Sequence, residues 1–91
     1  MSSNVIAEDL MIFTADWCKA CAQLKQLIDN DKSIEDKYNI IYVDYDANPD
    51  LVKQMKVRKI PTSFIFNKDG RIRSKNVGYD SIKYKQWINN N

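Results

Sequence analysis

Residues 10–21 read LMIFTADWCKAC, an apolar run that leads directly into the only two cysteines of the chain. The run Leu10–Thr14 is short and apolar, which predicts a buried strand. A helical pattern begins behind it, so Cys18 and Cys21 are expected where a strand passes into a helix. A thiol at a helix N-terminus faces unpaired backbone amides and the positive end of the helix dipole, which favour its thiolate. The sequence therefore predicts a redox site at this junction.

Three other interpretations of the cysteine pair stay open. A zinc site needs four sulfur or nitrogen ligands, whereas the chain has two cysteines and no histidine, so only a dimer sharing two pairs would complete one. A purely structural disulfide would close too short a loop to remove much entropy from the unfolded chain. In the third interpretation both cysteines are inert core residues. We expect redox chemistry, with no bound metal and no cofactor.

Length and composition indicate one domain over residues 1–91. The formal net charge of +2 is too small to indicate nucleic-acid binding, and the basic residues of 53–59 are typical of a solvated helix end. The first residues do not read as a secretory signal, and no apolar run reaches transmembrane length. We therefore expect a cytoplasmic protein whose cysteines meet a reducing environment.

The pattern along the chain predicts alternating strands and helices. Strands are expected at 9–14, 39–45, 62–67 and 71–76, and helices at 18–30, at 48–55 and from Asp80 or Ser81 onward, with a further turn at 34–38. The strand–helix–strand succession over 9–45 is typical of a βαβ unit with parallel strands. Asp69-Gly70 between two strand-like runs predicts a hairpin. The sequence thus indicates an α/β fold.

Two helices have a recognisable apolar face. The first is expected to bury Ala20, Leu24, Leu27 and Ile28, and the last Ile82, Tyr84, Trp87 and Ile88.

Pro61 stands directly before a predicted buried strand, where a proline cannot donate to the hydrogen-bond ladder. A strand start and a cis peptide bond both explain it.

Taken together, residues 9–90 resemble the thioredoxin family. The segments that carry the resemblance are Ala15–Cys21, Val43–Asp46 and Val57–Thr62, followed by Asp69-Gly70 and Val77-Gly78. The resemblance implies a cis Pro61 packed against the cysteine pair, and an Ile60 backbone left free to pair with an extended substrate segment. It also implies a shallow substrate groove lined by Trp17, Ile60 and Gly78.

The chain also departs from the family pattern. It begins near the family's second strand, with residues 1–8 unassigned, so we expect an N-terminally shortened thioredoxin-like fold. This fold is a four-stranded mixed sheet in the order 2-1-3-4, flanked by about three helices and close in plan to glutaredoxins. Lys19-Ala20 replaces the family's Gly-Pro between the cysteines. Ile12 and Tyr42 stand where the family has a buried aspartate and its lysine partner.

The activity that the resemblance implies is dithiol–disulfide exchange that reduces protein disulfides. Cys18 is expected to attack the substrate disulfide, and Cys21 to resolve the mixed disulfide that forms. Lys19 and Asp16 are the residues expected to tune the ionisation of the cysteines. Lys19 would stabilise the Cys18 thiolate, and Asp16 would substitute for the missing buried aspartate as an acceptor for the Cys21 proton.

Disulfide-containing proteins are the expected substrates, with a thioredoxin reductase as electron donor. Glutathione is the alternative donor, in a glutaredoxin-like cycle. Glutaredoxins often have paired glycines and an aspartate near the last loop. Gly78-Tyr79-Asp80 has only one glycine, and Asp80 is equally suited to cap a helix, so the sequence favours the reductase as donor.

A second alternative is a binding module that holds one partner protein and whose redox couple is incidental. We expect a monomer that binds neither nucleic acid nor membranes.

Overall fold

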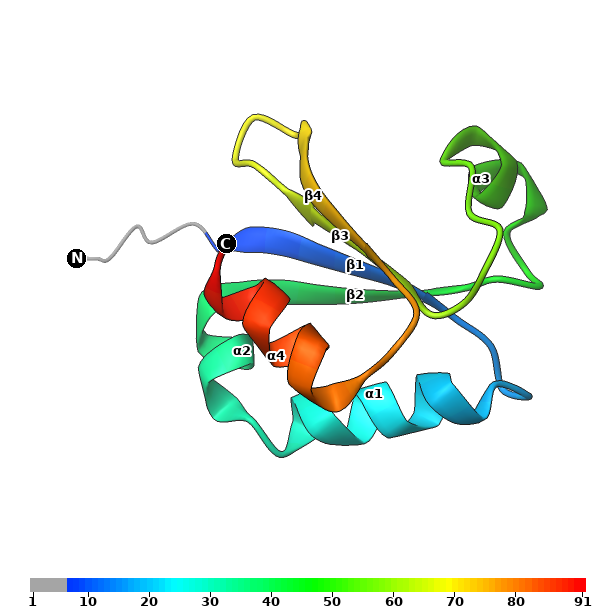
Figure 1. Cartoon of the computed structure of the whole chain (residues 1–91). Helices are drawn as coiled ribbons and strands as arrows, with labels where there is room; N and C mark the ends of the chain where they lie inside the picture. The colour runs from blue at the N-terminus through cyan, green and yellow to red at the C-terminus, as the bar shows by residue number, and fades with distance from the viewer. Residues whose placement is uncertain (1–6) are drawn as a thin grey trace.

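The computed structural model describes residues 7–91 of the chain. Its elements are β1 (Glu8–Thr14), α1 (Lys19–Asp29), α2 (Lys32–Lys37), β2 (Tyr38–Asp44), α3 (Pro49–Gln54), β3 (Thr62–Phe66), β4 (Ile72–Val77) and α4 (Ser81–Asn89). The strands form one sheet in the order β2-β1-β3-β4, which confirms the predicted order (Figure 1). β1 runs parallel to β2 and antiparallel to β3, and β3 runs antiparallel to β4, so the sheet is mixed.

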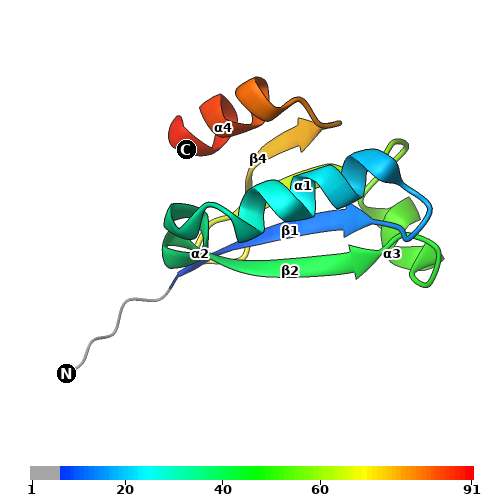
Figure 2. The same ribbon diagram turned by 90° about the horizontal axis from the view of Figure 1, so that it is seen from below.

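The predicted βαβ unit positions the cysteine pair. β1 and β2 pair in parallel from Glu8 opposite Tyr38 to Thr14 opposite Asp44, and α1 and α2 connect them. α1 begins just beyond the end at which both strands finish (Figure 2). Cys18, the N-cap residue of α1, therefore lies at the carboxyl end of the parallel strands, where sheets of this kind place their chemistry.

Hydrophobic side chains pack on both faces of the sheet, because successive strand residues point to opposite sides. On one face, Leu10, Ile12 and Ile65 lie beneath side chains of α1, α2 and α4. On the α3 face, Phe13 and Phe64 contact each other edge to face and pack with side chains of α3. The chain thus forms three layers, with helices on either side of the sheet.

The hairpin predicted at Asp69-Gly70 joins β3 to β4. Gly70 donates its N–H to the Asn67 carbonyl at 2.9 Å, and its φ of +86° is one that glycine adopts without strain. Ile72 and Val77 of β4 are about half exposed, as befits a strand that pairs on one side with β3 in the described part of the chain.

Three details differ from the sequence-based expectation. α2 is a separate fourth helix rather than a further turn, because the Asp31 carboxylate accepts a hydrogen bond from the Ser33 N–H and starts it. Ile82, expected in the apolar stripe of α4, is 70% exposed, whereas Tyr84 and Ile88 are buried. Of residues 1–8, left unassigned, Glu8 begins β1 and residues 1–6 lie outside the described residues.

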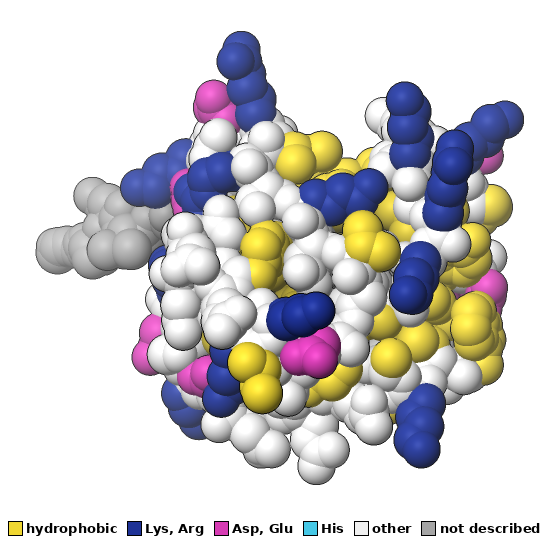
Figure 3. All heavy atoms as spheres, in the orientation of Figure 1, with side chains coloured by type: hydrophobic (Ala, Val, Ile, Leu, Met, Phe, Trp, Pro, Cys, Tyr) yellow, Lys and Arg dark blue, Asp and Glu magenta, His cyan; other side chains and the backbone are white. Residues whose placement is uncertain are grey.

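The surface is mixed in character. Figure 3 shows Lys and Arg side chains projecting across the face drawn there, and hydrophobic side chains exposed between them at the end where α3 and the start of α1 lie. No helix within residues 7–91 is long and apolar enough to cross a membrane.

Candidate active site

The cysteine pair sits at the turn between β1 and α1. Cys18 donates its N–H to the Ala15 carbonyl at 3.1 Å, which closes the turn, and its extended backbone makes it the N-cap of α1. Cys18 and Cys21 are joined by a disulfide. The Cys18 sulfur accepts a hydrogen bond from the Cys21 N–H at 3.2 Å. Negative charge on Cys18 is therefore stabilised by a backbone donor as well as by the helix dipole.

The two sulfurs differ in their access to solvent. Cys18 is 8% exposed and Cys21 is 1% exposed. Both pack in a small cluster with Ala15, against which Tyr45 and Ile60 lie. Of the two sulfur-bearing residues, Cys18 is therefore the more accessible to a molecule arriving from solution.

A loop distant in sequence completes the surroundings of Cys18. The Ile60 carbonyl oxygen lies 3.8 Å from the Cys18 sulfur, close enough to accept a hydrogen bond from the reduced thiol. The Ile60–Pro61 peptide bond is cis. Gly78 donates its N–H to the Pro61 carbonyl at 2.7 Å. The structure thus brings Ile60, Pro61 and Gly78 together beside the disulfide.

Trp17 projects from the turn, 67% exposed, and its indole Nε1–H donates to the Asp46 carboxylate at 2.7 Å. Asp46 was not among the predicted site residues, although it ends the segment Val43–Asp46, which carries part of the family resemblance. The bond joins residues 29 apart in the chain, so no local pattern links Asp46 to Trp17. Asp46 fixes the orientation of an otherwise exposed indole beside Cys18.

The two residues proposed to tune ionisation are both exposed. Lys19 begins α1, and Asp16 precedes Trp17 in the turn. Among residues 7–91 neither side chain makes a hydrogen bond or an ion pair. Both residues are close to the cysteines in sequence, but the structure shows no hydrogen bond or ion pair that would hold either side chain beside a cysteine sulfur.

The position of the family's buried aspartate is fully apolar here. Ile12 has no exposed surface and packs in the core with Leu10 and Leu24. Tyr42 lies opposite it on β2, with the Lys25 ammonium 5.0 Å from the centre of its ring. Burial, together with the nearby carboxylates of Asp29 and Glu35, raises the pKa of Tyr42 to about 12. An alkyl side chain at position 12 cannot accept a proton from Cys21.

Metal ligands are also scarce around the pair. Within residues 7–91 no group of three or more histidine, cysteine, aspartate and glutamate side chains is placed to hold a metal ion. The chemistry that the site itself supports is exchange between its two sulfurs and an incoming disulfide.

Comparison with known proteins identifies the family. The family model described as thioredoxin matches residues 3–90. The thioredoxin of Rickettsia bellii (strain RML369-C) is 33% identical over 93 aligned positions, which cover 97% of this chain and 88% of the relative. The thioredoxin of Rhodospirillum rubrum is 31% identical over 78 positions, which cover 84% and 74% of the two chains.

Solved structures agree in fold. The germline-specific thioredoxin Deadhead of Drosophila melanogaster superposes with a TM-score of 0.81 at 21% identity, covering 92% of this chain and 80% of that one. A thioredoxin of Malassezia sympodialis gives a TM-score of 0.78 at 26% identity, with coverages of 91% and 73%. With the cysteine pair in place at the helix N-terminus, the chain belongs to the thioredoxin family and is a dithiol–disulfide oxidoreductase that reduces protein disulfides.

Proposed function

We propose that Cys18 is the nucleophile of this reductase and Cys21 the resolving thiol. The observation that carries the assignment is their unequal burial, because Cys18 keeps some exposed surface and Cys21 has almost none. The hydrogen bond from the Cys21 N–H to the Cys18 sulfur supports the same assignment, since it favours the Cys18 thiolate.

The proposed cycle moves two electrons from the cysteine pair to the substrate. The Cys18 thiolate attacks one sulfur of a protein disulfide, forms a mixed disulfide and releases the other sulfur as a thiolate. The Cys21 thiolate then attacks the Cys18 sulfur, closes the Cys18–Cys21 disulfide and releases the second substrate thiolate. The substrate is reduced and the protein oxidised, in the state that the structure describes.

The surface around Cys18 is proposed to hold the substrate. An extended segment would pair with the backbone at Ile60, beside Pro61 and Gly78, and its side chains would lie against the Trp17 indole. The proximity of the Ile60 carbonyl to the Cys18 sulfur supports this placement. Lys19 is proposed to favour the Cys18 thiolate through its charge, and Asp16 to accept the proton of Cys21 through water.

A thioredoxin reductase is the proposed electron donor. The Asp80 carboxylate accepts hydrogen bonds from the N–H groups of Ile82 and Lys83, both at 3.1 Å, and is therefore already engaged as the cap of α4. This favours a reductase over glutathione, for which that aspartate would have to remain available. We also propose that the chain acts as a single-domain monomer in the cytoplasm, where reduced cysteines persist.

Reduction of insulin disulfides by dithiothreitol tests the proposal, with the native chain beside Cys18→Ser and Cys21→Ser. We expect clear acceleration by the native chain and none by either variant. Activity retained by Cys21→Ser alone would favour a monothiol cycle driven by glutathione. No acceleration by the native chain would favour a binding module, the alternative to which the apolar Ile12 lends some support.

A further inference from the structure

A small hollow of about 240 Å³ lies next to the proposed substrate groove. It is lined by residues from three parts of the chain, among them Lys59, Gly78 and Lys83. Gly78 joins it to the groove, because the Gly78 N–H donates to the carbonyl of Pro61. A substrate segment docked at Ile60 would therefore pass the mouth of this hollow.

Lys59 lies at the edge of the hollow, and its side chain extends toward Gly78. Its backbone carbonyl accepts a hydrogen bond from the Thr62 hydroxyl. Its ammonium nitrogen lies 3.9 Å from the point that a Cβ on Gly78 would occupy, so the side chain extends across the glycine. The absent side chain at Gly78, whose φ is +85°, leaves the space that the lysine and the hollow share.

Lys83 contributes a second positive charge from the first turn of α4. The positive end of the helix dipole lies there, so a lysine at this position opposes the stability of the helix rather than supporting it. Departures from a local rule of this kind are expected where a residue serves a function. The position of Lys83 is accounted for if it faces an incoming negative charge.

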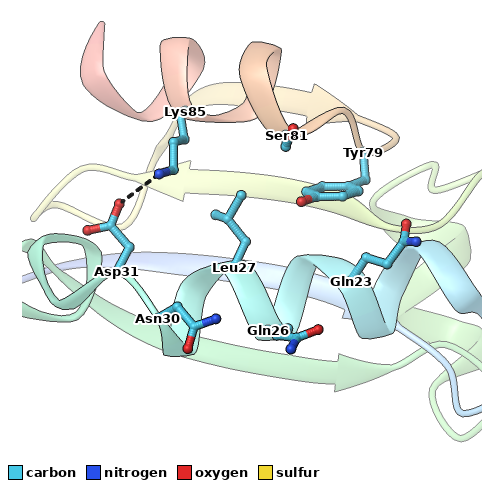
Figure 4. Close-up of a pocket in the computed structure, with 8 residues that line it drawn as sticks. All are labelled: Gln23, Gln26, Leu27, Asn30, Asp31, Tyr79, Ser81 and Lys85. Atoms are coloured by element: carbon cyan, nitrogen blue, oxygen red, sulfur yellow. Dashed lines mark ion pairs between the residues drawn. The ribbon is translucent and has the colours of Figure 1, made fainter.

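The lining of the hollow keeps a net positive charge, because two lysines, Lys59 and Lys83, stand against one carboxylate, that of Asp80. Within residues 7–91 neither makes an ion pair, and Asp80, the acidic residue that lines the same hollow, directs its carboxylate to the backbone of α4. Lys85, on the same helix, is different. It pairs with Asp31 at 3.9 Å across a larger hollow between α1 and α4 (Figure 4). Tyr79 lines both hollows.

We propose that the hollow at Lys59 and Lys83 binds a carboxylate side chain of the substrate polypeptide, close in sequence to the cysteine under attack. The inference rests on the proposed docking of substrate at Ile60 and adds a preference to it. Among disulfides of similar reactivity, those flanked by aspartate or glutamate are reduced faster. The two lysines act on substrate selection and leave the sulfur chemistry to Cys18 and Cys21.

Disulfide-bridged peptides that differ only in glutamate or glutamine within two residues of the reacting cysteine test the proposal. The quantity measured is the ratio of kcat/KM for the glutamate peptide to that for the glutamine peptide. We expect the native ratio to exceed one at one of these positions, and each of Lys59→Gln and Lys83→Gln to lower it by about twofold to fivefold, the range of an exposed ion pair. Raising the salt concentration should lower the native ratio in the same direction.

Lys85→Gln is the matched control, because it removes an equal charge from the same helix outside this hollow, and it should leave the ratio unchanged. A native ratio of one at every position, or an equal fall in Lys85→Gln, would overturn the proposal. A ratio of one for peptides, combined with lysine-dependent reduction of a glutathione mixed disulfide, would overturn the polypeptide assignment in favour of glutathione's carboxylates. If the native chain reduced none of the peptides, the proposed function itself would have failed.

Discussion

The sheet face covered by α1, α2 and α4 and the face covered by α3 differ in how completely they bury their hydrophobic side chains. Beneath α1, α2 and α4, the side chains of Leu10, Ile12 and Leu24 have no exposed surface. On the α3 face, Phe13 and Phe64 are buried, but Met11, Leu51 and Phe66 are only partly covered and line an open hollow of about 620 Å³. The first face buries its central side chains more completely than the second, and we call it the closed face, although a hollow between α1 and α4 borders it.

The difference shows where the redox site obtains its rigidity. α1 carries Cys18 at its first turn and is fixed to the closed face by Leu24 and Ile28. The shorter α3 has no fully buried residue. We infer that the closed face supplies most of the stability that positions the disulfide, and that the α3 face supplies less.

The largest expected effect compares a leucine on each face. Leu24→Ala should lower the free energy of unfolding by about 3 kcal/mol, because it leaves a cavity in a closed core, and Leu51→Ala by about 1 kcal/mol, because its site is already open. Urea denaturation of the two variants checks this. Equal losses would contradict the proposed difference between the faces.

A smaller effect is expected from one hydroxyl within the closed face. The Tyr84 hydroxyl donates to the Ser63 hydroxyl at 2.9 Å, and both residues have no exposed surface. Tyr84→Phe leaves Ser63 without this partner and should cost about 1–2 kcal/mol, whereas Tyr42→Phe, at a half-exposed site, should cost less. Ser63→Ala combined with Tyr84→Phe should recover part of the loss. If Tyr42→Phe cost as much as Tyr84→Phe, burial of the hydroxyl pair would not be the cause.

The last expected effect is absent at neutral pH and appears only in alkali. Burial raises the pKa of Tyr84 above its usual range, and burial with nearby carboxylates raises that of Tyr42 to about 12. Both phenols are protonated in the folded protein at a pH where unfolded tyrosine, with a pKa of about 10, ionises. Their contribution to stability is therefore complete below about pH 10 and is lost as the pH rises through the folded-state values.

Unfolding free energies measured from neutral to alkaline pH check this prediction, with phenolate absorbance as a second readout. Above pH 10 the native protein should lose stability more steeply than Tyr84→Phe. Identical slopes for the two proteins would mean that Tyr84 ionises as easily in the folded protein as in the unfolded chain.

Much of the fold was predictable because its elements have strong local patterns. The apolar run at Leu10–Thr14 and the strand formers at 62–66 each correspond to a strand, and Asp69-Gly70 corresponds to the hairpin. Ile82 was assigned wrongly because periodicity does not say which stripe of a short helix faces the core. It lies two residues, or about 200°, around α4 from Tyr84, and so points to solvent.

The site was predictable only where a motif marks it. The spacing of Cys18 and Cys21 and the segment Val57–Thr62 identified residues that the structure brings together. The bond between Trp17 and Asp46 and the approach of Lys59 to Gly78 join distant residues that no local pattern links. Contacts of this kind depend on the packed arrangement of the whole chain, which is why they emerge only from the structure.

The central claim is that Cys18 attacks and Cys21 resolves, and trapping the mixed disulfide tests it most directly. Cys21→Ser and Cys18→Ser are each incubated with a disulfide-bridged peptide, and the products are identified by mass spectrometry without reduction. We predict a stable covalent complex through Cys18 in Cys21→Ser and little or none in Cys18→Ser, whose remaining sulfur is buried. A complex that accumulates through Cys21 at a comparable rate would contradict the account.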